Sequence, residues 1–238
     1  MEKDNEIIYA IGDSSFESVR SRGAVYVDKT DLVYRLVTRG KCYFLSRPRR
    51  FGKSLLLSTL EAYFLGRKDL FGGLAIEQLE KEWNAYPVLH LDFMERKYVK
   101  DEALLWQLQK QLERWENEYG IAVKNGLDLE GRFGDVILAA EERHGRPAVV
   151  LIDEYDKPLL DALGNDTLEE RNRTLLASFY GVLKSQMAHL RFVLLTGVTR
   201  FSHVSIFSGL NNLQDISMDT RYDALCGITQ AELQANLG

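Results

Sequence analysis

The chain has 238 residues, of which 45% are hydrophobic, and this suits one large domain, or one with small appendages, around a substantial core. Its 30 basic and 35 acidic residues give a net charge of −5, which argues against a generally basic nucleic-acid surface but is compatible with a local basic patch. Neither the apolar segment of a signal peptide nor a run of ~20 apolar residues occurs, so we expect a cytoplasmic protein without membrane contact.

The first part of the chain predicts a leader followed by a short extended and helical segment. Residues 1–13 have the composition of a loosely held leader, and residues 24–27 form a short extended piece. Thr30 or Asp31 can then cap a helix over about 32–38. We expect residues 1–40 to pack on a core domain formed by residues 41–238.

Residues 41–54 read KCYFLSRPRRFGKS and predict a phosphate-binding loop. An apolar run, residues 42–45, leads into a basic loop that closes on Gly-Lys-Ser, and a helix-forming run follows. In this context the backbone N–H groups of the loop and of the helix N-terminus point at phosphate oxygens. Lys53 can then reach the β- and γ-phosphates, and the hydroxyl of Ser54 can ligate Mg²⁺. The residues that we expect to bind the cofactor are Arg49, Arg50, Phe51, Gly52, Lys53, Ser54 and Leu55.

The loop departs from the usual pattern G-x-x-x-x-G-K-[ST], because Arg47 stands in place of the first glycine. The departure leaves an alternative open, in which the segment is a basic turn before a buried helix. Arg49 and Arg50 lie inside the loop, and a guanidinium group pairs well with phosphate, so one of the two is a candidate phosphate contact.

The sequence predicts a strand and two helices between this loop and the next motif. Residues 87–93 form the strand, residues 101–119 form an amphipathic helix that Gly120 ends, and residues 129–143 form a further helix. A polar connection over residues 67–86, with aromatic anchors, precedes them.

Residues 147–158 read PAVVLIDEYDKP and predict a buried parallel strand that ends in two acids. At such a strand end Asp153 would hold Mg²⁺, directly or through water, and Glu154 would orient and polarise the attacking water as a general base. The alternative is that the acid pair only starts a solvated loop. For Asp156 and Lys157 we favour a surface ion pair over an effect on the two acids.

Residues 168–187 predict a helix, and residues 191–200, RFVLLTGVTR, predict another buried strand, over 192–195, with a polar tip. Thr196 is our first choice, and Thr199 our second, for the sensor residue that P-loop ATPases often place beside the metal-binding acid. Arg200 is a candidate for contact with a γ-phosphate, in cis or from a neighbouring subunit; the alternative is a surface arginine that caps a loop.

The alternation of strands and helices indicates an α/β fold, namely the three-layer α/β/α sandwich of P-loop NTPases with a mostly parallel sheet of about five strands. The motif order matches ATPases in which an extra strand, the one with the sensor, is inserted between the two motif strands. Ligands of such folds bind at the carboxyl ends of the strands. The residues that would meet there are Ser54, Asp153, Glu154 and Thr196.

Five blocks of the sequence resemble the bacterial and archaeal AAA-ATPase-like family. They are YVDKT at 26–30, RPRRFGKS at 47–54, LIDEYDKP at 151–158, LTGVTRFS at 195–202 and SGLNNLQDIS at 208–217. The resemblance covers about residues 16–229, and in this family, too, an arginine stands where the first glycine of the loop is usual. It implies a P-loop ATPase core related to the AAA+ and signal-transduction ATPase classes. Family members often have a C-terminal nuclease-like domain of the PD-(D/E)XK type.

The last residues predict the start of another helix. Thr229 and Glu232 form a capping-box pattern, and the chain stops at Gly238. We therefore expect a fragment, with the lid subdomain and any nuclease-like domain downstream of it. Nucleic acid would be a partner through that missing domain, and turnover by this chain alone does not follow from the sequence.

We expect Mg²⁺-dependent ATP binding and hydrolysis, with ATP and Mg²⁺ as cofactors. Lys53 and the loop backbone would hold the phosphates, and Ser54 and Asp153 would hold the metal. Glu154 would activate water and Thr196 would sense the γ-phosphate. The alternative is a nucleotide-gated switch with little turnover that controls an attached effector domain. The hypothesis of a DNA-acting enzyme rests only on the association of the family with nuclease-like domains. The hypothesis of a homo-oligomer rests only on the possibility that Arg200 acts in trans.

Overall fold

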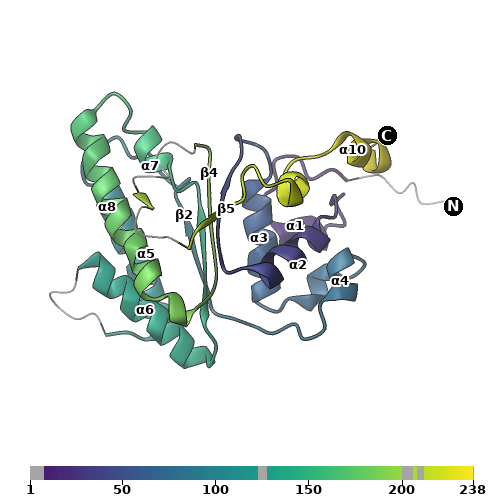
Figure 1. The fold of residues 1–238 in the computed structure, drawn as a ribbon, viewed down its shortest axis with the longest axis horizontal. Helices are drawn as coiled ribbons and strands as arrows, with labels where there is room; N and C mark the ends of the chain where they lie inside the picture. Colours follow the sequence, from purple (N-terminus) through teal and green to yellow (C-terminus); the bar gives the residue numbers. More distant parts are fainter. Residues whose placement is uncertain (1–7, 123–127, 200–205, 208–211, 238) are drawn as a thin grey trace. The chain divides into compact units, whose positions relative to one another are not determined.

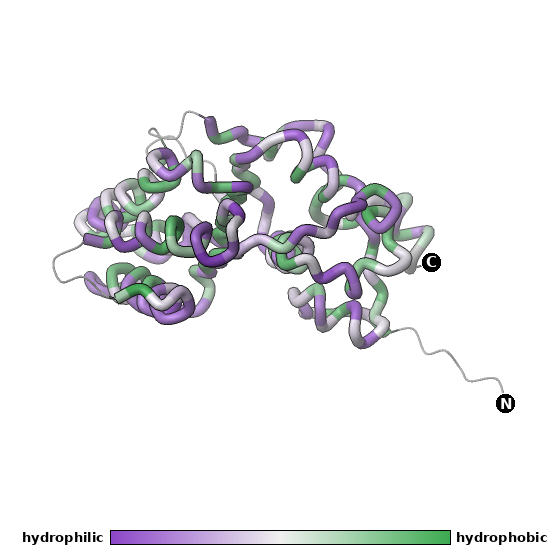
Figure 2. The backbone as a smooth tube through the Cα atoms, turned by 90° about the horizontal axis from the view of Figure 1, so that it is seen from below, coloured by the Kyte–Doolittle hydropathy of each residue, from purple (hydrophilic) through white to green (hydrophobic). Residues whose placement is uncertain are grey.

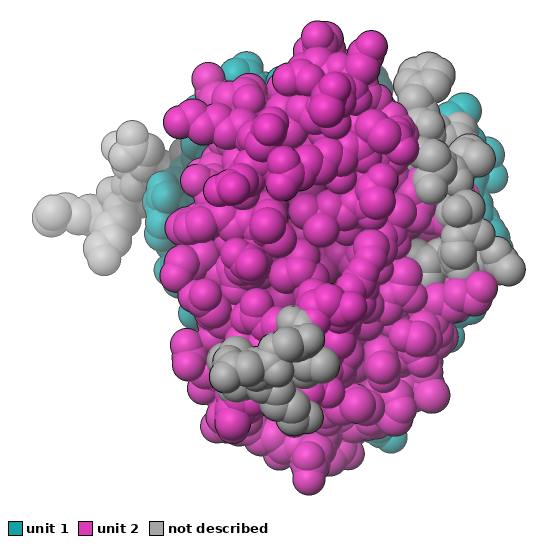
Figure 3. All heavy atoms as spheres, turned by 90° about the vertical axis from the view of Figure 1, so that its left-hand side faces the viewer, with its two compact units in different colours: residues 1–40, 49–85, 218–238 teal, residues 41–48, 86–217 magenta. Residues whose placement is uncertain are grey.

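Five parallel strands form the central element of the described chain. The structure, a computed structural model, describes residues 8–122, 128–199, 206–207 and 212–237. The chain groups into two compact units, which Figure 3 distinguishes by colour. We call residues 41–48 and 86–217 the sheet unit, and residues 1–40, 49–85 and 218–238 the helical unit.

All the strands in the described residues belong to the sheet unit. They are β1 (Cys42–Ser46), β2 (Val88–Asp92), β3 (Ala148–Asp153), β4 (Leu190–Gly197) and β5 (Gln214–Asp215). They pair in the order β2-β3-β4-β1-β5, and each of these pairings is parallel. Every residue of β3 is buried, which explains why this strand is a continuous apolar run up to its terminal acid. The predicted α/β fold with about five mostly parallel strands is confirmed.

The strand order determines which motif segments are neighbours. β4 pairs with β1 on one side, where Gly197 lies opposite Ser46, and with β3 on the other. The strand of the predicted sensor is therefore inserted between the strand of the phosphate loop and the strand of the acid pair, as the sequence led us to expect. β2 pairs with β3 so that Asp92 lies opposite Asp153.

Three long helices pack in the sheet unit (Figure 1). Their side chains supply its aromatic core. The helices are α5 (Ala103–Tyr119), α6 (Leu129–His144) and α8 (Asp166–Ser185), to which the short α7 (Lys157–Leu160) and η2 (Met187–His189) are added. The ring of Phe133 stacks on Trp115 at 5.7 Å and on Phe179 at 4.5 Å between centroids. Hydrophilic and hydrophobic residues alternate along these helices (Figure 2), as expected where one helix face is buried.

The ends of these helices follow local sequence signals. α5 ends at Gly120, which has a left-handed φ of +70°, as predicted. The side chains of Asp128 and Asn165 cap α6 and α8 by accepting hydrogen bonds from the N–H groups of Gly131 and Leu168. Within the part of the chain that the structure describes, no helix combines the length and the apolar character needed to span a membrane.

The helical unit contains short helices around a second aromatic core. Its helices are α1 (Phe16–Ser21), α2 (Thr30–Arg39), α3 (Lys53–Phe64), η1 (Lys68–Phe71), α4 (Ala75–Leu79), η3 (Thr220–Leu225) and α10 (Gln230–Leu237). The ring of Phe71 lies 4.8 Å from that of Phe16 and 5.1 Å from that of Trp83. Phe71 and Trp83 are thus the aromatic anchors that the sequence predicts in the connection 67–86.

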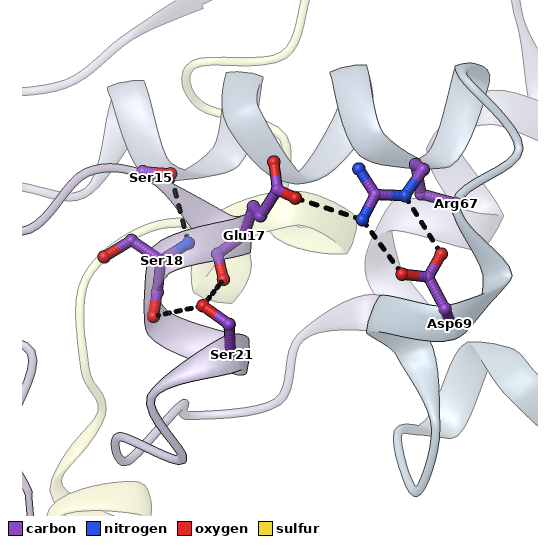
Figure 4. A network of polar contacts seen from close by, with 6 residues as sticks. All are labelled: Ser15, Glu17, Ser18, Ser21, Arg67 and Asp69. Carbon is purple, nitrogen blue, oxygen red and sulfur yellow. Dashed lines mark hydrogen bonds and ion pairs between the residues drawn. The ribbon is translucent and has the colours of Figure 1, made fainter.

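A polar network joins α1 to the segment that follows α3 (Figure 4). Ser15 caps α1 by accepting a hydrogen bond from the N–H of Ser18. The guanidinium of Arg67 contacts Glu17 of α1 at 3.0 Å and Asp69 at 2.9 Å. These ion pairs are exposed, so they fix the local geometry more than they add to stability.

Asp28 joins the N-termini of α2 and α4. One of its oxygens accepts hydrogen bonds from the N–H (2.9 Å) and the hydroxyl (2.7 Å) of Thr30, and the other accepts one from the N–H of Ala75 (2.7 Å). The prediction that Thr30 or Asp31 caps this helix is wrong, because α2 begins at Thr30 itself and its first N–H is satisfied by Asp28.

The capping box predicted at the end of the chain is confirmed. The N–H of Thr229 donates to the carboxylate of Glu232 at 2.7 Å, and the N–H of Glu232 donates to the hydroxyl of Thr229 at 3.3 Å. The same carboxylate accepts two hydrogen bonds, at 2.7 and 2.9 Å, from the buried ammonium of Lys29. The start of α10 is therefore bonded to the residue that precedes α2.

A buried ion pair between α5 and α6 gives a test of this packing. Glu116 accepts two hydrogen bonds of 2.7 Å from Arg132, and only 3% of the Glu116 side chain is exposed. The substitution Glu116→Gln removes the counter-charge of a largely buried guanidinium, so we expect the free energy of unfolding to fall by roughly 2 kcal/mol in urea denaturation. Glu113→Gln is the matched control on the same helix, because its pair with Lys110 is about half exposed and should contribute little. Equal effects of the two substitutions would contradict the assigned burial.

Candidate functional site

The acid pair of the sheet unit lies at the carboxyl end of β3 and is buried. Only 2% of Asp153 and 6% of Glu154 is exposed, so the alternative that they merely start a solvated loop is wrong. The hydroxyl of Thr196, at the end of the adjacent β4, donates a hydrogen bond to Oδ1 of Asp153. The structure thus brings together the acid that we expect to hold the metal and the residue that we expect to be the sensor.

The chain turns sharply directly after Asp153. Glu154 has a φ of +53°, a left-handed conformation that costs a non-glycine residue about 1 kcal/mol or more. The N–H of Tyr155 donates to the carbonyl of Thr196 at 2.9 Å, and the N–H of Lys157 donates to the carbonyl of Glu154 at 3.0 Å. These bonds maintain the strained backbone. We call residues 153–157 the acid turn.

Asp156 joins the acid turn to residues 196–199, which we call the β4 turn. Its buried carboxylate accepts hydrogen bonds from the N–H of Val198 (3.1 Å) and from the N–H (2.6 Å) and hydroxyl (2.7 Å) of Thr199. The expected surface ion pair is therefore wrong for Asp156, because the β4 turn and not Lys157 satisfies its carboxylate. Lys157 does form an ion pair, at 2.6 Å, but with Asp161.

The two turns also fit together by close packing at Gly197. A Cβ atom on Gly197 would lie 2.4 Å from the ring of Tyr155 and 2.9 Å from the carboxylate of Asp156, so only glycine fits there. The hydroxyl of Tyr155 donates to the carbonyl of Thr199 at 3.0 Å, and its ring packs edge-on against Phe44 with 5.4 Å between centroids. The tyrosine ring is thus held on both sides and cannot easily move away.

Asp92 is a third acid at this edge of the sheet, and the sequence analysis did not single it out. It ends β2 opposite Asp153, and its Oδ1 accepts a hydrogen bond from the N–H of Met94 at 2.7 Å. Burial raises the pKa of Asp92; the Met94 N–H opposes this effect, and the negative charge of Asp153 adds to it. The only sequence signal for Asp92 was an acid near the end of the strand predicted over 87–93.

Arg47, which replaces the first glycine of the predicted phosphate loop, connects the end of β1 to its neighbours. Its N–H donates to the carbonyl of Gly197 at 3.1 Å, and its guanidinium donates to the carbonyl of Ser217 at 2.6 Å. The hydroxyl of the preceding Ser46 donates to the carbonyl of Val198 at 2.9 Å. The arginine side chain thus makes contacts that a glycine could not make.

The remaining loop residues belong to the helical unit, where α3 begins at Lys53 and so forms the helix that the sequence predicts after the loop. The φ angles of Arg50 and Gly52 are positive, +63° and +83°, and the backbone reverses just before the helix. Gly52 has no side chain to cap α3, and the first turn of the helix contains no acidic residue. Lys53 is buried, Ser54 and Leu55 are half-buried, and the exposed residues are Arg49, Arg50, Phe51 and Gly52.

Gly227 contacts this loop, and the sequence analysis did not single it out. Its N–H donates to the carbonyl of Phe51 at 2.8 Å. A Cβ atom on Gly227 would lie 2.8 Å from the Phe51 ring, and the φ of Gly227 is +81°. The only signal in the sequence was a glycine shortly before the predicted capping box.

Some predicted features fall outside this description. Arg200 lies outside the described residues. Among the residues that are described, no group of three or more His, Cys, Asp and Glu side chains is arranged to hold a metal ion. A magnesium ion that binds with a nucleotide needs fewer protein ligands, because one or two carboxylates, the substrate phosphates and water complete its shell.

The chain is similar to known proteins at the level of family and sequence. A family model described as "Predicted AAA-ATPase" matches residues 10–207. The chain is 42% identical over 226 residues to the "Uncharacterized protein in vnfD 5'region" of Azotobacter chroococcum mcd 1; the match covers 94% of this chain but 44% of that protein, so the chain spans less than half of this relative's length. A solved structure, Cdc6p from Pyrobaculum aerophilum, aligns with a TM-score of 0.44 and 14% identity over 93% of this chain and 52% of that one.

The close contact at Gly197 gives a test of the interlocked turns. Gly197→Ala would push a methyl group into a tyrosine ring that is packed on its other side, so we expect a loss of about 2 kcal/mol or more in the free energy of unfolding. Gly181→Ala is the control, since nothing lies within 4 Å of a Cβ atom there and the residue is inside α8. It should stabilise by about 0.5–1 kcal/mol. Urea denaturation that finds both substitutions neutral would contradict the packing described.

Proposed function

The chain belongs to the AAA-ATPase-like family, and from this premise we propose that it binds ATP with Mg²⁺ and hydrolyses it. In this proposal Lys53 and the loop backbone bind the phosphates. Ser54 and Asp153 hold the metal ion. Glu154 activates the attacking water as general base, and Thr196 senses the γ-phosphate.

One observation supports the proposal most directly, namely the contact of Thr196 with Asp153 across two adjacent parallel strands. A hydroxyl that donates to a carboxylate fixes its orientation, as outer partners of metal ligands generally do. The same bond gives β4 a direct link to the proposed metal ligand. Thr196 is fully buried, and a buried polar side chain needs a hydrogen-bond partner, which Asp153 supplies. This contact with the proposed metal ligand suits a sensor residue.

The acids at this edge of the sheet fit a divalent cation. Asp153 and Asp92 lie opposite each other, and the raised pKa of Asp92 reflects burial together with the charge of its neighbour. Carboxylate oxygens are the protein ligands that Mg²⁺ prefers. When bound, Mg²⁺ would neutralise charge on the β- and γ-phosphates during transfer.

The start of α3 fits an anion. The first turn of α3 combines the positive end of the helix dipole with the ammonium group of Lys53, and both favour an anion. A phosphate group at this position would offset both charges. The exposed Arg49 and Arg50 are further candidates for phosphate contact, and Arg200 is our candidate for the γ-phosphate. Action of Arg200 in trans would require a homo-oligomer.

A second candidate function is a nucleotide-gated switch with little turnover. It is favoured by the bond of the loop to the C-terminal segment, since Phe51 accepts a hydrogen bond from Gly227. A rearrangement of the loop on nucleotide binding would act on Gly227 and so on the segment that leads to α10. Such a switch needs a local change and an element with two arrangements.

Glu154→Gln separates hydrolysis from binding. The amide cannot accept the proton of the attacking water, so we expect kcat for phosphate release from Mg-ATP to fall by at least about 100-fold. ATP affinity, measured by equilibrium titration, should be retained. Glu142→Gln, at an exposed position of α6, is the matched control and should leave both quantities unchanged.

Two outcomes would count against hydrolysis through Glu154. Turnover of the Glu154→Gln variant at the wild-type rate would remove Glu154 as the base. Tight Mg-ATP binding without turnover in the wild-type chain would favour the switch.

A further inference from the structure

The buried carboxylate of Asp156 is a group that the proposed function leaves unused. A carboxylate that is withdrawn from water is costly unless hydrogen bonds compensate it. The bonds that Asp156 accepts come from Val198 and Thr199, so its compensation depends on the β4 turn. An apolar residue would fill this position in the core without the cost of desolvating a carboxylate. The presence of Asp156 therefore indicates that its contact with the β4 turn matters.

Glu154 is the residue that depends on this contact. Its left-handed backbone is unfavourable, and it persists only while the surrounding structure imposes it. On its C-terminal side, the N–H of Tyr155 bonds to Thr196, and one residue later Asp156 bonds to the β4 turn. Without Asp156, the acid turn would lose its bonds to Val198 and Thr199, and Glu154 could relax toward an ordinary conformation.

We propose that Asp156 is a positioning residue: by bonding to Val198 and Thr199 it fixes the acid turn against the β4 turn and so keeps Glu154 where it can take a proton from water. The inference rests on the proposed function. Asp156 itself touches neither substrate nor metal in this account, and acts through the backbone of the acid turn.

The contacts of the phosphate loop with the β4 turn predict which kinetic constant changes. Arg47 bonds to the carbonyl group of Gly197, and Ser46 bonds to that of Val198. Both bonds lie at the ends of β1 and β4, which pair with each other along their length. These carbonyls do not contact Asp156, which accepts from N–H and hydroxyl groups. Loss of Asp156 should therefore lower turnover and leave ATP binding by the loop largely intact.

The test is a kinetic double-mutant cycle with Asp156→Asn and Thr199→Val. We expect Asp156→Asn to lower kcat by roughly 10- to 100-fold through misplacement of the base, with KM for Mg-ATP changed by less than about threefold. Thr199→Val removes only the hydroxyl contact and should lower kcat less. The double variant should be no slower than Asp156→Asn, because both residues act through one contact.

Glu116→Gln is the control for stability. It alters another buried carboxylate, and it should destabilise the fold while kcat per folded molecule stays at the wild-type value. If Asp156→Asn does not fold, Thr199→Val and Tyr155→Phe, which lacks the hydroxyl bond to Thr199, each remove one bond between the turns and still test the claim.

The outcomes separate this inference from the proposed function. A wild-type kcat in folded Asp156→Asn, or additive losses in the cycle, would overturn the positioning role alone. Absence of turnover in the wild-type chain would overturn hydrolysis and the positioning role together.

Discussion

The hydrogen bonds between the acid turn and the β4 turn are the constraint on which the rest of the candidate site depends. Pairing of the parallel strands β3 and β4 brings their carboxyl ends to the same edge of the sheet, but it does not set the conformation of the residues beyond the strands. Thr196, Tyr155 and Asp156 supply the bonds that do so. A strained Glu154 and a glycine at position 197 are the consequences of this close approach.

The position of β4 in the middle of the sheet explains why polar groups collect at this edge. Its neighbours β1 and β3 bury their apolar side chains with it, and the buried polar side chains of β3 and β4, Asp153 and Thr196, lie at or near the carboxyl ends. Once buried there, a polar side chain must find a partner. Asp153 and Thr196 satisfy each other, and Asp156 is satisfied by the turn that Thr196 begins.

Much of this architecture could be predicted, because the signals are local. Apolar runs indicated the long strands, Gly120 and the capping box at Thr229 indicated helix ends, and motif order indicated the inserted strand. The family resemblance supplied the function class. For the strands and the helix ends, the residues that give the signal lie within the element that they predict or next to it.

The errors and omissions concern contacts between distant segments. The partners of Asp156 lie 42 and 43 positions away in the sequence, so an ion pair with the adjacent lysine was the simpler expectation. Asp28 also bonds to Ala75, 47 positions away, a contact that the sequence analysis did not predict. Gly227 was overlooked because its partner is Phe51, far earlier in the chain.

The blocks that resemble the family are more than a nucleotide motif. Asp28 and Lys29 of the YVDKT block join helices of the helical unit, and Arg47 of the loop block bonds to Ser217 of the last block. Asp156 and Thr199 join the LIDEYDKP and LTGVTRFS blocks. Their side chains therefore have structural reasons to be specific, in addition to any contact with a ligand.

The measurement that tests the central claim most directly is the Mg²⁺ dependence of ATP affinity in the wild-type chain and in Asp153→Asn. The account predicts that Mg²⁺ strengthens wild-type binding by about tenfold or more, equivalent to ~1.4 kcal/mol. The variant should lose this gain while its affinity without Mg²⁺ is unchanged, since its amide oxygen can still accept the hydrogen bond from Thr196. The same Mg²⁺ dependence in both proteins would contradict the assignment of the metal to Asp153.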